Sequence, residues 1–146
     1  MSCGNQYAPE LRARGFRVTP QRMAVLHVLR HSGQRLTPAE VYRRAHLELP
    51  RLTETTVYRT LDFLARNGFA WPTRIRTGRL VYEIAGRQHH HLICRQCGAE
   101  IEVEHALMRS LYTKLEAASG YHLADEHLTL FGVCPDCQKA AVGRRA

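Results

Sequence analysis

The sequence predicts an α+β fold in two parts, and three observations support the prediction. Apolar residues at helical spacing, each run opened by a capping residue, fill most of the first half. A basic hairpin pattern follows them, and two C-x-x-C pairs stand in the second half. The net charge of +8 lies wholly in residues 1–86, whereas most histidines and cysteines lie in residues 87–146. We therefore expect two domains, 1–86 and 87–146, with a polyanion-binding front half and a metal-binding back half.

Composition excludes several classes of protein. No stretch approaches the roughly 20 consecutive apolar residues that a membrane helix needs, so we expect no membrane partner. The first ten residues contain no basic-then-apolar run, so we expect no secretory signal and a cytoplasmic location. In that reducing compartment five cysteines favour metal ligation over disulfides, and the odd one, Cys3, is expected to be a free thiol.

Three helices of the first domain are predicted from their start and stop signals. Each starts at an N-cap threonine, two have proline at the first helical position and one completes a capping box. The three start signals are Thr19-Pro20, Thr37-Pro38-Ala39-Glu40 and Thr53. Ser32-Gly33, Pro50 and Asn67-Gly68 bound the helices at their carboxyl ends. A weaker helix is predicted around residues 9–14.

The stretch from Phe69 to Glu83 predicts a β-hairpin that turns at Thr77-Gly78-Arg79. Three helices followed by a basic hairpin is the winged helix-turn-helix order, in which the third helix enters the major groove of DNA. On that helix the side chains of Thr56, Tyr58 and Arg59 lie off the buried stripe, where they can contact bases or phosphates. The alternative is a partly buried tyrosine and an ordinary surface arginine, but the charge asymmetry and the hairpin arginines favour DNA.

Two cysteine pairs in the second half have the spacing of a zinc site. Cys94 with Cys97 and Cys134 with Cys137 can complete a tetrahedral shell of four thiolates, which we favour over redox disulfides. The long segment between the pairs must hold structure of its own. Its apolar pattern predicts a half-buried strand at Ile101 and Val103. A helix follows, marked by Leu107, Leu111 and Leu115, and then a final strand marked by Leu128, Leu130 and Val133.

A second metal site is predicted directly before the first cysteine pair. In an extended segment, His89 and His91 face one way and His90 the other. With Glu83 upstream and Glu102 on the next strand, they make a set of two nitrogen and two oxygen donors, which suits Fe(II), Mn(II) or Zn(II). A polar strand end is the alternative, but the position of the histidines at the boundary between the two halves favours a metal site.

In order along the chain, these motifs resemble the ferric uptake regulator superfamily. The resemblance covers roughly residues 9–137 and depends on TVYRTLDFLARNGF at 56–69, HHHLICRQCG at 89–98 and GVCPDC at 132–137. It implies a cytoplasmic, homodimeric, metal-dependent transcriptional regulator, usually a repressor. It further implies an N-terminal winged helix-turn-helix for operator DNA and a small α/β dimerisation domain with a four-cysteine zinc site.

The resemblance also assigns roles by position. It implies DNA contacts by Arg17, Tyr58 and Arg59. It implies a structural zinc site formed by Cys94, Cys97, Cys134 and Cys137. It also implies a regulatory metal site formed by Glu83, His89, His91 and Glu102. The family's regulatory site usually adds a histidine at a position that is Gln34 or Arg35 here, and His31 is the nearest histidine that could replace it. A further family site falls on Gln88, His90, Arg109 and Glu126. Because arginine cannot ligate a metal, we expect Arg109 and Glu126 to form an ion pair there.

We therefore predict a repressor controlling metal-ion homeostasis, with structural Zn²⁺ and a regulatory Fe²⁺ or Mn²⁺. Many zinc-sensing members have a cysteine upstream of the histidines, where this chain has Ala85, so iron or manganese is favoured over zinc. Zinc-uptake and peroxide-sensing regulators of the same family are the alternatives. A zinc hydrolase with Glu83 or Glu102 as general base is more remote, because the chain lacks HExxH, nucleophile and phosphate-loop signatures. We therefore expect no enzyme and no small organic substrate.

Overall fold

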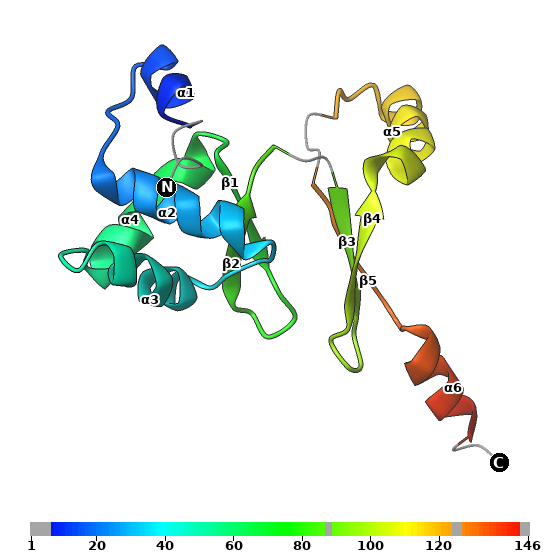
Figure 1. Cartoon of the computed structure of the whole chain (residues 1–146). Helices are drawn as coiled ribbons and strands as arrows, with labels where there is room; N and C mark the ends of the chain where they lie inside the picture. The colour runs from blue at the N-terminus through cyan, green and yellow to red at the C-terminus, as the bar shows by residue number, and fades with distance from the viewer. Residues whose placement is uncertain (1–6, 87–88, 124–126, 144–146) are drawn as a thin grey trace. The chain divides into compact units, whose positions relative to one another are not determined.

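The computed structural model describes residues 7–86, 89–123 and 127–143, and the chain divides into two units, Met1–Gly86 and Arg87–Ala146 (Figure 1). The predicted α+β class is confirmed, because helices and a hairpin make up the first unit and a sheet with two helices makes up the second. Within the described ranges no helix is long and apolar enough to cross a membrane. Cys3 lies outside the described residues.

Threonine caps start the main helices of the first unit where the sequence predicted them. The helices are α1 (Tyr7–Ala13), α2 (Pro20–Ser32), α3 (Pro38–Glu48) and α4 (Glu54–Arg66). The side-chain oxygens of Thr19, Thr37 and Thr53 each accept a hydrogen bond from a backbone N–H in the following turn. Glu40 completes the capping box of α3 by accepting from the backbone N–H of Thr37 at 2.7 Å. These contacts satisfy N–H groups that a helix start leaves unpaired.

The predicted hairpin packs against the helices and completes a winged arrangement. It consists of β1 (Ala70–Arg74) and β2 (Leu80–Ile84), paired antiparallel with Trp71 opposite Glu83. Gly78 at the turn has φ +79°, a left-handed value that favours glycine. Helices α2, α3 and α4 pack on one another, and α2 and α4 contact the hairpin. The core between them is apolar and includes Leu11, Val25, Leu26, Leu29, Leu36, Val41, Val57, Leu61 and Leu64.

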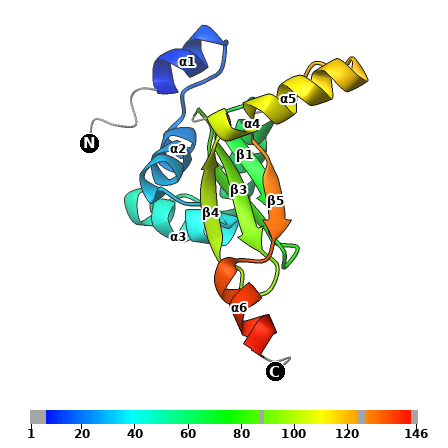
Figure 2. The same cartoon turned by 90° about the vertical axis from the view of Figure 1, so that its right-hand side faces the viewer.

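The second unit is built on a three-stranded sheet with β3 (His89–Cys94) at its centre. The antiparallel neighbour is β4 (Glu100–Glu104) and the parallel neighbour is β5 (Thr129–Gly132). Figure 2 shows α5 (His105–Ser119) and α6 (Pro135–Gly143) at opposite ends of this sheet. Helix α6 was not predicted from the sequence; it begins inside the second cysteine pair, with proline in its first turn.

The apolar residues that marked α5 and β4 are not buried within this chain. Leu107, Leu111 and Leu115 are 76%, 43% and 47% exposed, and Ile101 on β4 is 60% exposed. Met108 is the buried residue of α5. The predicted helix and strand are therefore present, but the apolar face that predicted them is left uncovered by the second unit itself.

Candidate metal centres and DNA interface

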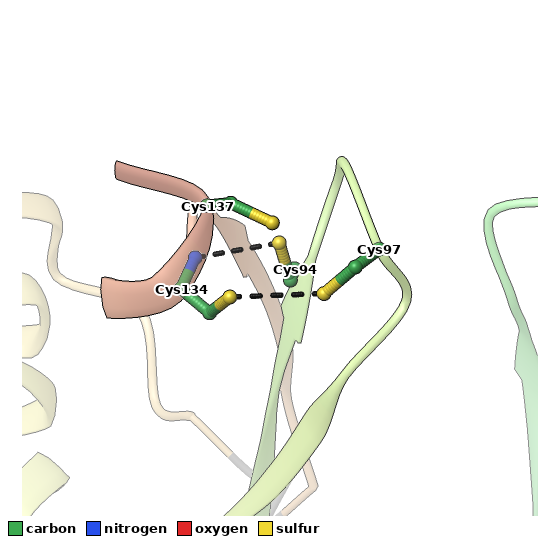
Figure 3. Close-up of side chains that lie close together, drawn as sticks. All are labelled: Cys94, Cys97, Cys134 and Cys137. Atoms are coloured by element: carbon green, nitrogen blue, oxygen red, sulfur yellow. Dashed lines mark hydrogen bonds between the residues drawn. The ribbon is translucent and has the colours of Figure 1, made fainter. Parts of the chain in front are cut away.

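Four cysteines at one end of the sheet converge on one point. Cys94 ends β3, Cys97 lies in the turn after it, and Cys134 and Cys137 flank the start of α6 (Figure 3). The four sulfur atoms all lie within 4.8 Å of one another, and the Sγ atoms of Cys97 and Cys134 are 3.7 Å apart. Zinc–sulfur bonds of about 2.3 Å in a tetrahedron hold sulfurs about 3.8 Å apart, whereas a disulfide requires about 2.05 Å. This geometry confirms that the four cysteines converge, and we call them the four-cysteine cluster; their role as zinc ligands stays a prediction.

Backbone N–H groups surround the cluster and favour thiolate. The N–H groups of Gln96 and Cys134 donate to the sulfur of Cys94 at 3.4 and 3.3 Å. Backbone hydrogen bonds, first from Cys97 and then from Cys134, lower the pKa of the Cys94 thiol to about 6. The pKa of the Cys137 thiol is raised to about 12, mainly by hydrogen bonds to the sulfurs of Cys134 and Cys97. The surroundings therefore favour a thiolate at Cys94 and a protonated thiol at Cys137.

The predicted alternation of the histidines along β3 places two imidazoles together. His89 and His91 are 7% and 5% exposed, and their ring centroids lie 4.8 Å apart. His127, directly before β5, joins them with centroid distances of 5.1 Å to His89 and 4.9 Å to His91. One ring nitrogen of each histidine lies within 4.8 Å of the others, a spacing that suits a single cation. His127 was not among the ligands predicted from the sequence.

Two glutamates of β4 approach these rings. The Oε1 of Glu102, a predicted ligand, lies 3.5 Å from the Nε2 of His89. The Oε1 of Glu100, which was not predicted, lies 2.6 Å from the Nδ1 of His91. Glu83, the remaining predicted ligand, is 7% exposed on β2 of the first unit. The assignment of Glu83 and Glu102 as ligands stays a prediction.

His90 occupies the opposite face of β3 and makes a different kind of contact. It is fully buried, and its Nδ1 accepts the backbone N–H of Leu128 at 3.1 Å. The ring must therefore carry its proton on Nε2, which lies 3.1 Å from the Nδ1 of His105. Burial, and next the neighbouring His105, lower the pKa of His90 below 6.5. His90 is thus a neutral structural side chain whose two ring nitrogens are both engaged.

The other residues of that further family site give less information. Gln88 and Glu126 lie outside the described residues, so the expected ion pair between Arg109 and Glu126 stays a prediction. His31, the candidate extra ligand, is exposed in the last turn of α2, and its Nδ1 lies 2.9 Å from the backbone oxygen of His27. Its role as a ligand also stays a prediction.

The predicted DNA-contacting side chains lie on the surface of the first unit. Helix α4 buries Val57, Leu61 and Leu64 and leaves Tyr58 half exposed and Arg59 exposed. Thr56 lies one turn from the N-cap, with its hydroxyl 2.8 Å from that of Thr53, and Arg17 is exposed before α2. The hairpin adds the exposed arginines Arg74, Arg76 and Arg79. Such a helix with flanking arginines can supply both base and phosphate contacts.

Comparisons with known proteins identify a family for this chain. Residues 13–131 match the ferric uptake regulator family. The ferric uptake regulation protein of Synechococcus elongatus is 35% identical over 137 residues, covering 91% of this chain and 93% of that protein. The structure of the Pseudomonas aeruginosa ferric uptake regulator with manganese matches with a TM-score of 0.74 and 27% identity, covering 88% and 97% of the two chains. A zinc-bound manganese uptake regulator is 30% identical with a TM-score of 0.61, covering 90% and 98%.

Proposed function

This chain belongs to the ferric uptake regulator family of metal-dependent transcription regulators, and we propose that it is a homodimeric repressor of metal-ion homeostasis. The predictions of family and of a metal-dependent regulator are confirmed, and the hydrolase alternative is set aside because proteins of this family are transcription regulators. As such a regulator it acts on double-stranded operator DNA, in the cytoplasm.

The observation that carries the proposal is the buried pair His89 and His91 beside the carboxylates of β4. Two imidazoles with adjacent carboxylates form a donor set of nitrogen and oxygen that suits a divalent transition ion. The set contains no sulfur, and among the described residues every cysteine belongs to the four-cysteine cluster. We therefore assign structural Zn²⁺ to the cysteines and a regulatory Fe²⁺ or Mn²⁺, in preference to Zn²⁺, to the histidines.

The regulatory ligands would link the two units. When bound, the ion would be a common centre for donor atoms of both units. The first unit would supply Glu83, with His31 as an extra candidate, and the second would supply His89, His91 and Glu102. Fixing these side chains restricts rotation about Ala85-Gly86-Arg87. In a two-fold dimer the two α4 helices are then held at one separation, as paired half-sites of an operator require.

Dimer formation through the second unit is supported by its uncovered apolar surface. Large apolar side chains are exposed on β4, α5, β5 and the chain that flanks them: Ile101, Leu107, Leu111, Leu115, Tyr121, Leu130, Phe131 and Val133. Large apolar side chains left exposed in this way are unusual in a monomer when they form a patch, and they are typical of an interface. Structures of the family are dimeric DNA-binding regulators.

The metal dependence is tested by replacing both histidines in the full-length chain. We expect His89→Ala/His91→Ala to lose metal-stimulated operator binding while keeping the zinc of the four-cysteine cluster and the dimer. Gel shifts at buffered free Fe²⁺, Mn²⁺ and Zn²⁺ measure the response and rank the three ions. A double variant that responds as the wild type does would contradict the proposal.

DNA recognition is tested on α4. Arg59→Ala is expected to weaken operator binding by about 1–3 kcal/mol, because an arginine pairing with a base edge contributes that much. Arg66→Ala on the same helix is the matched control, since that arginine is paired with Asp62 at 3.1 Å. Equal effects of the two substitutions would remove Arg59 from the sequence readout.

A further inference from the structure

Three imidazoles of the second unit, those of His89, His91 and His127, are spaced as ligands of one ion would be. The ring centroids of His89, His91 and His127 are 4.8, 4.9 and 5.1 Å apart, and the ring planes meet at 69–77°. An ion with metal–nitrogen bonds of about 2.0–2.1 Å in tetrahedral geometry holds the centroids of its imidazole ligands about 5 Å apart. The observed triangle therefore matches a three-imidazole site.

The fold fixes His127 in this position. Strands β5 and β3 are parallel, and Thr129 is the register partner of His91. The backbone N–H of His91 donates to the carbonyl oxygen of Leu128 at 2.8 Å, which ties the start of β5 to the middle of β3. His127 lies two residues before Thr129, so strand alternation points its side chain to the same face as His89 and His91.

Carboxylates of β4 also lie beside these rings. The Oε1 of Glu100 is 2.6 Å from the Nδ1 of His91, and the Oε1 of Glu102 is 3.5 Å from the Nε2 of His89. Carboxylates commonly stand beside metal-binding histidines, where they orient the rings.

A cavity reaches one member of this cluster, His89. A cavity of about 450 Å³ is lined by His89, by Glu102 and Glu104 of β4, and by His105 and Arg109 at the start of α5. Carboxylates beside such an opening attract cations, and an exchangeable site needs an entry path.

We propose that His127 is a third imidazole ligand of the regulatory ion, a divalent first-row transition metal. The proposal rests on the proposed function, because it takes the His89–His91 cluster as the regulatory site. It makes three nitrogen donors of the second unit the nucleus of that site, with carboxylates completing the shell.

The test uses the full-length chain with zinc in the four-cysteine cluster and Co²⁺ as the probe of the second site. We expect His127→Ala and His127→Gln each to weaken Co²⁺ binding by at least about 10-fold and to change its d–d absorption bands. His122→Ala is the control, because His122 is an exposed histidine of the same unit that pairs with Glu116, and it should bind Co²⁺ as the wild type does. X-ray absorption on the Co²⁺-loaded wild type should count three imidazoles at this site.

The inference is overturned if both His127 variants bind Co²⁺ with unchanged affinity and bands, or if absorption counts two imidazoles. That result would leave the proposed function standing, provided that His89→Ala/His91→Ala still loses the metal response. If the double variant keeps its response, the proposed function itself fails. Should His127→Ala lose its zinc or its fold, the glutamine variant and the wild-type imidazole count decide the matter.

Discussion

The two units bury different kinds of side chain. The first encloses leucines, valines and aromatic rings from four helices and a hairpin. In the described part of the second unit, the buried residues are Ile93, Cys94, Met108 and three consecutive histidines. The first unit therefore gains its stability mainly from apolar area removed from water, at about 25 cal/mol per Å².

In the described part of the second unit, large apolar side chains are exposed, whereas the predicted ligands His89, His91 and Cys94 are buried. A segment of this size that buries little apolar surface is marginal on its own and usually needs a metal or a partner. The four-cysteine cluster ties the turn after β3 to the start of α6, and a second copy would cover α5 and β4. The first unit therefore has an apolar core of its own, whereas we expect the second to depend on bound ions and self-association.

The largest expected effect comes from breaking the four-cysteine cluster. We expect Cys94→Ser to lose the zinc and unfold the second unit, because structural zinc binding contributes about 10–16 kcal/mol in zinc-finger peptides and is coupled to folding. The first unit should stay folded. The single tryptophan, Trp71 in β1, reports on the first unit through its fluorescence, while bound zinc reports on the second.

Cys3→Ser is the control for that substitution, since Cys3 belongs to neither C-x-x-C pair. The contrary outcome is that Cys94→Ser unfolds the first unit together with the second, which would appear as a lower urea midpoint of the Trp71 fluorescence transition. The two units would then fold as one, and the contrast drawn between them would be wrong.

A smaller effect is expected from charging the uncovered face. Ile101→Asp should weaken self-association by roughly 10-fold or more, because burying one large apolar side chain contributes about 1.5–3 kcal/mol. Leu47→Asp is the matched control on the first unit, where Leu47 is 82% exposed on α3. Sedimentation equilibrium measures both, and equal dimer affinities for the two variants would place the interface elsewhere.

The elements of the first unit were more predictable from the sequence than those of the second. Helices α2, α3 and α4 were predictable because their caps are local signals, each set by residues three apart in the chain. The four-cysteine cluster was predictable because paired cysteines leave few alternatives. His127 was not, because its place beside His91 depends on the parallel pairing of β5 with β3, across more than 30 residues.

Side-chain direction limited the prediction in β4 as well. The alternation of Ile101 and Val103 predicted the strand and put its glutamates on one side, but it could not tell which carboxylate meets which ring. In the structure Glu102 is the register partner of His91, yet the Oε1 of Glu100 lies 2.6 Å from the Nδ1 of His91. The exposure of the α5 leucines could not be predicted either, because an amphipathic pattern does not say whether its apolar face is covered by the same chain.

The smallest expected effect concerns the capping box of α3, the most local of the signals that build the first unit. Thr37→Ala should cost about 1 kcal/mol of unfolding free energy at pH 7, measured by urea unfolding with Trp71 fluorescence. Glu40→Ala is expected to remove the other half of the box, and Glu48→Ala at the opposite end of the same helix is the matched control.

Acid should reveal the same contact. Hydrogen bonds from the hydroxyl and then the backbone N–H of Thr37 lower the pKa of Glu40 below 4.5. Because the folded pKa is lower than the unfolded one, this stabilisation is present above pH 4.5 and is lost as the pH falls through the folded value. The difference in unfolding free energy between the wild type and Glu40→Gln should therefore shrink as the pH falls from 6 to 3. If that free-energy difference stayed constant, the glutamate would act by its shape and not by its charge. The stabilisation of the start of α3 by a charged cap would then be contradicted, and only the Thr37 side chain would remain as its local cap.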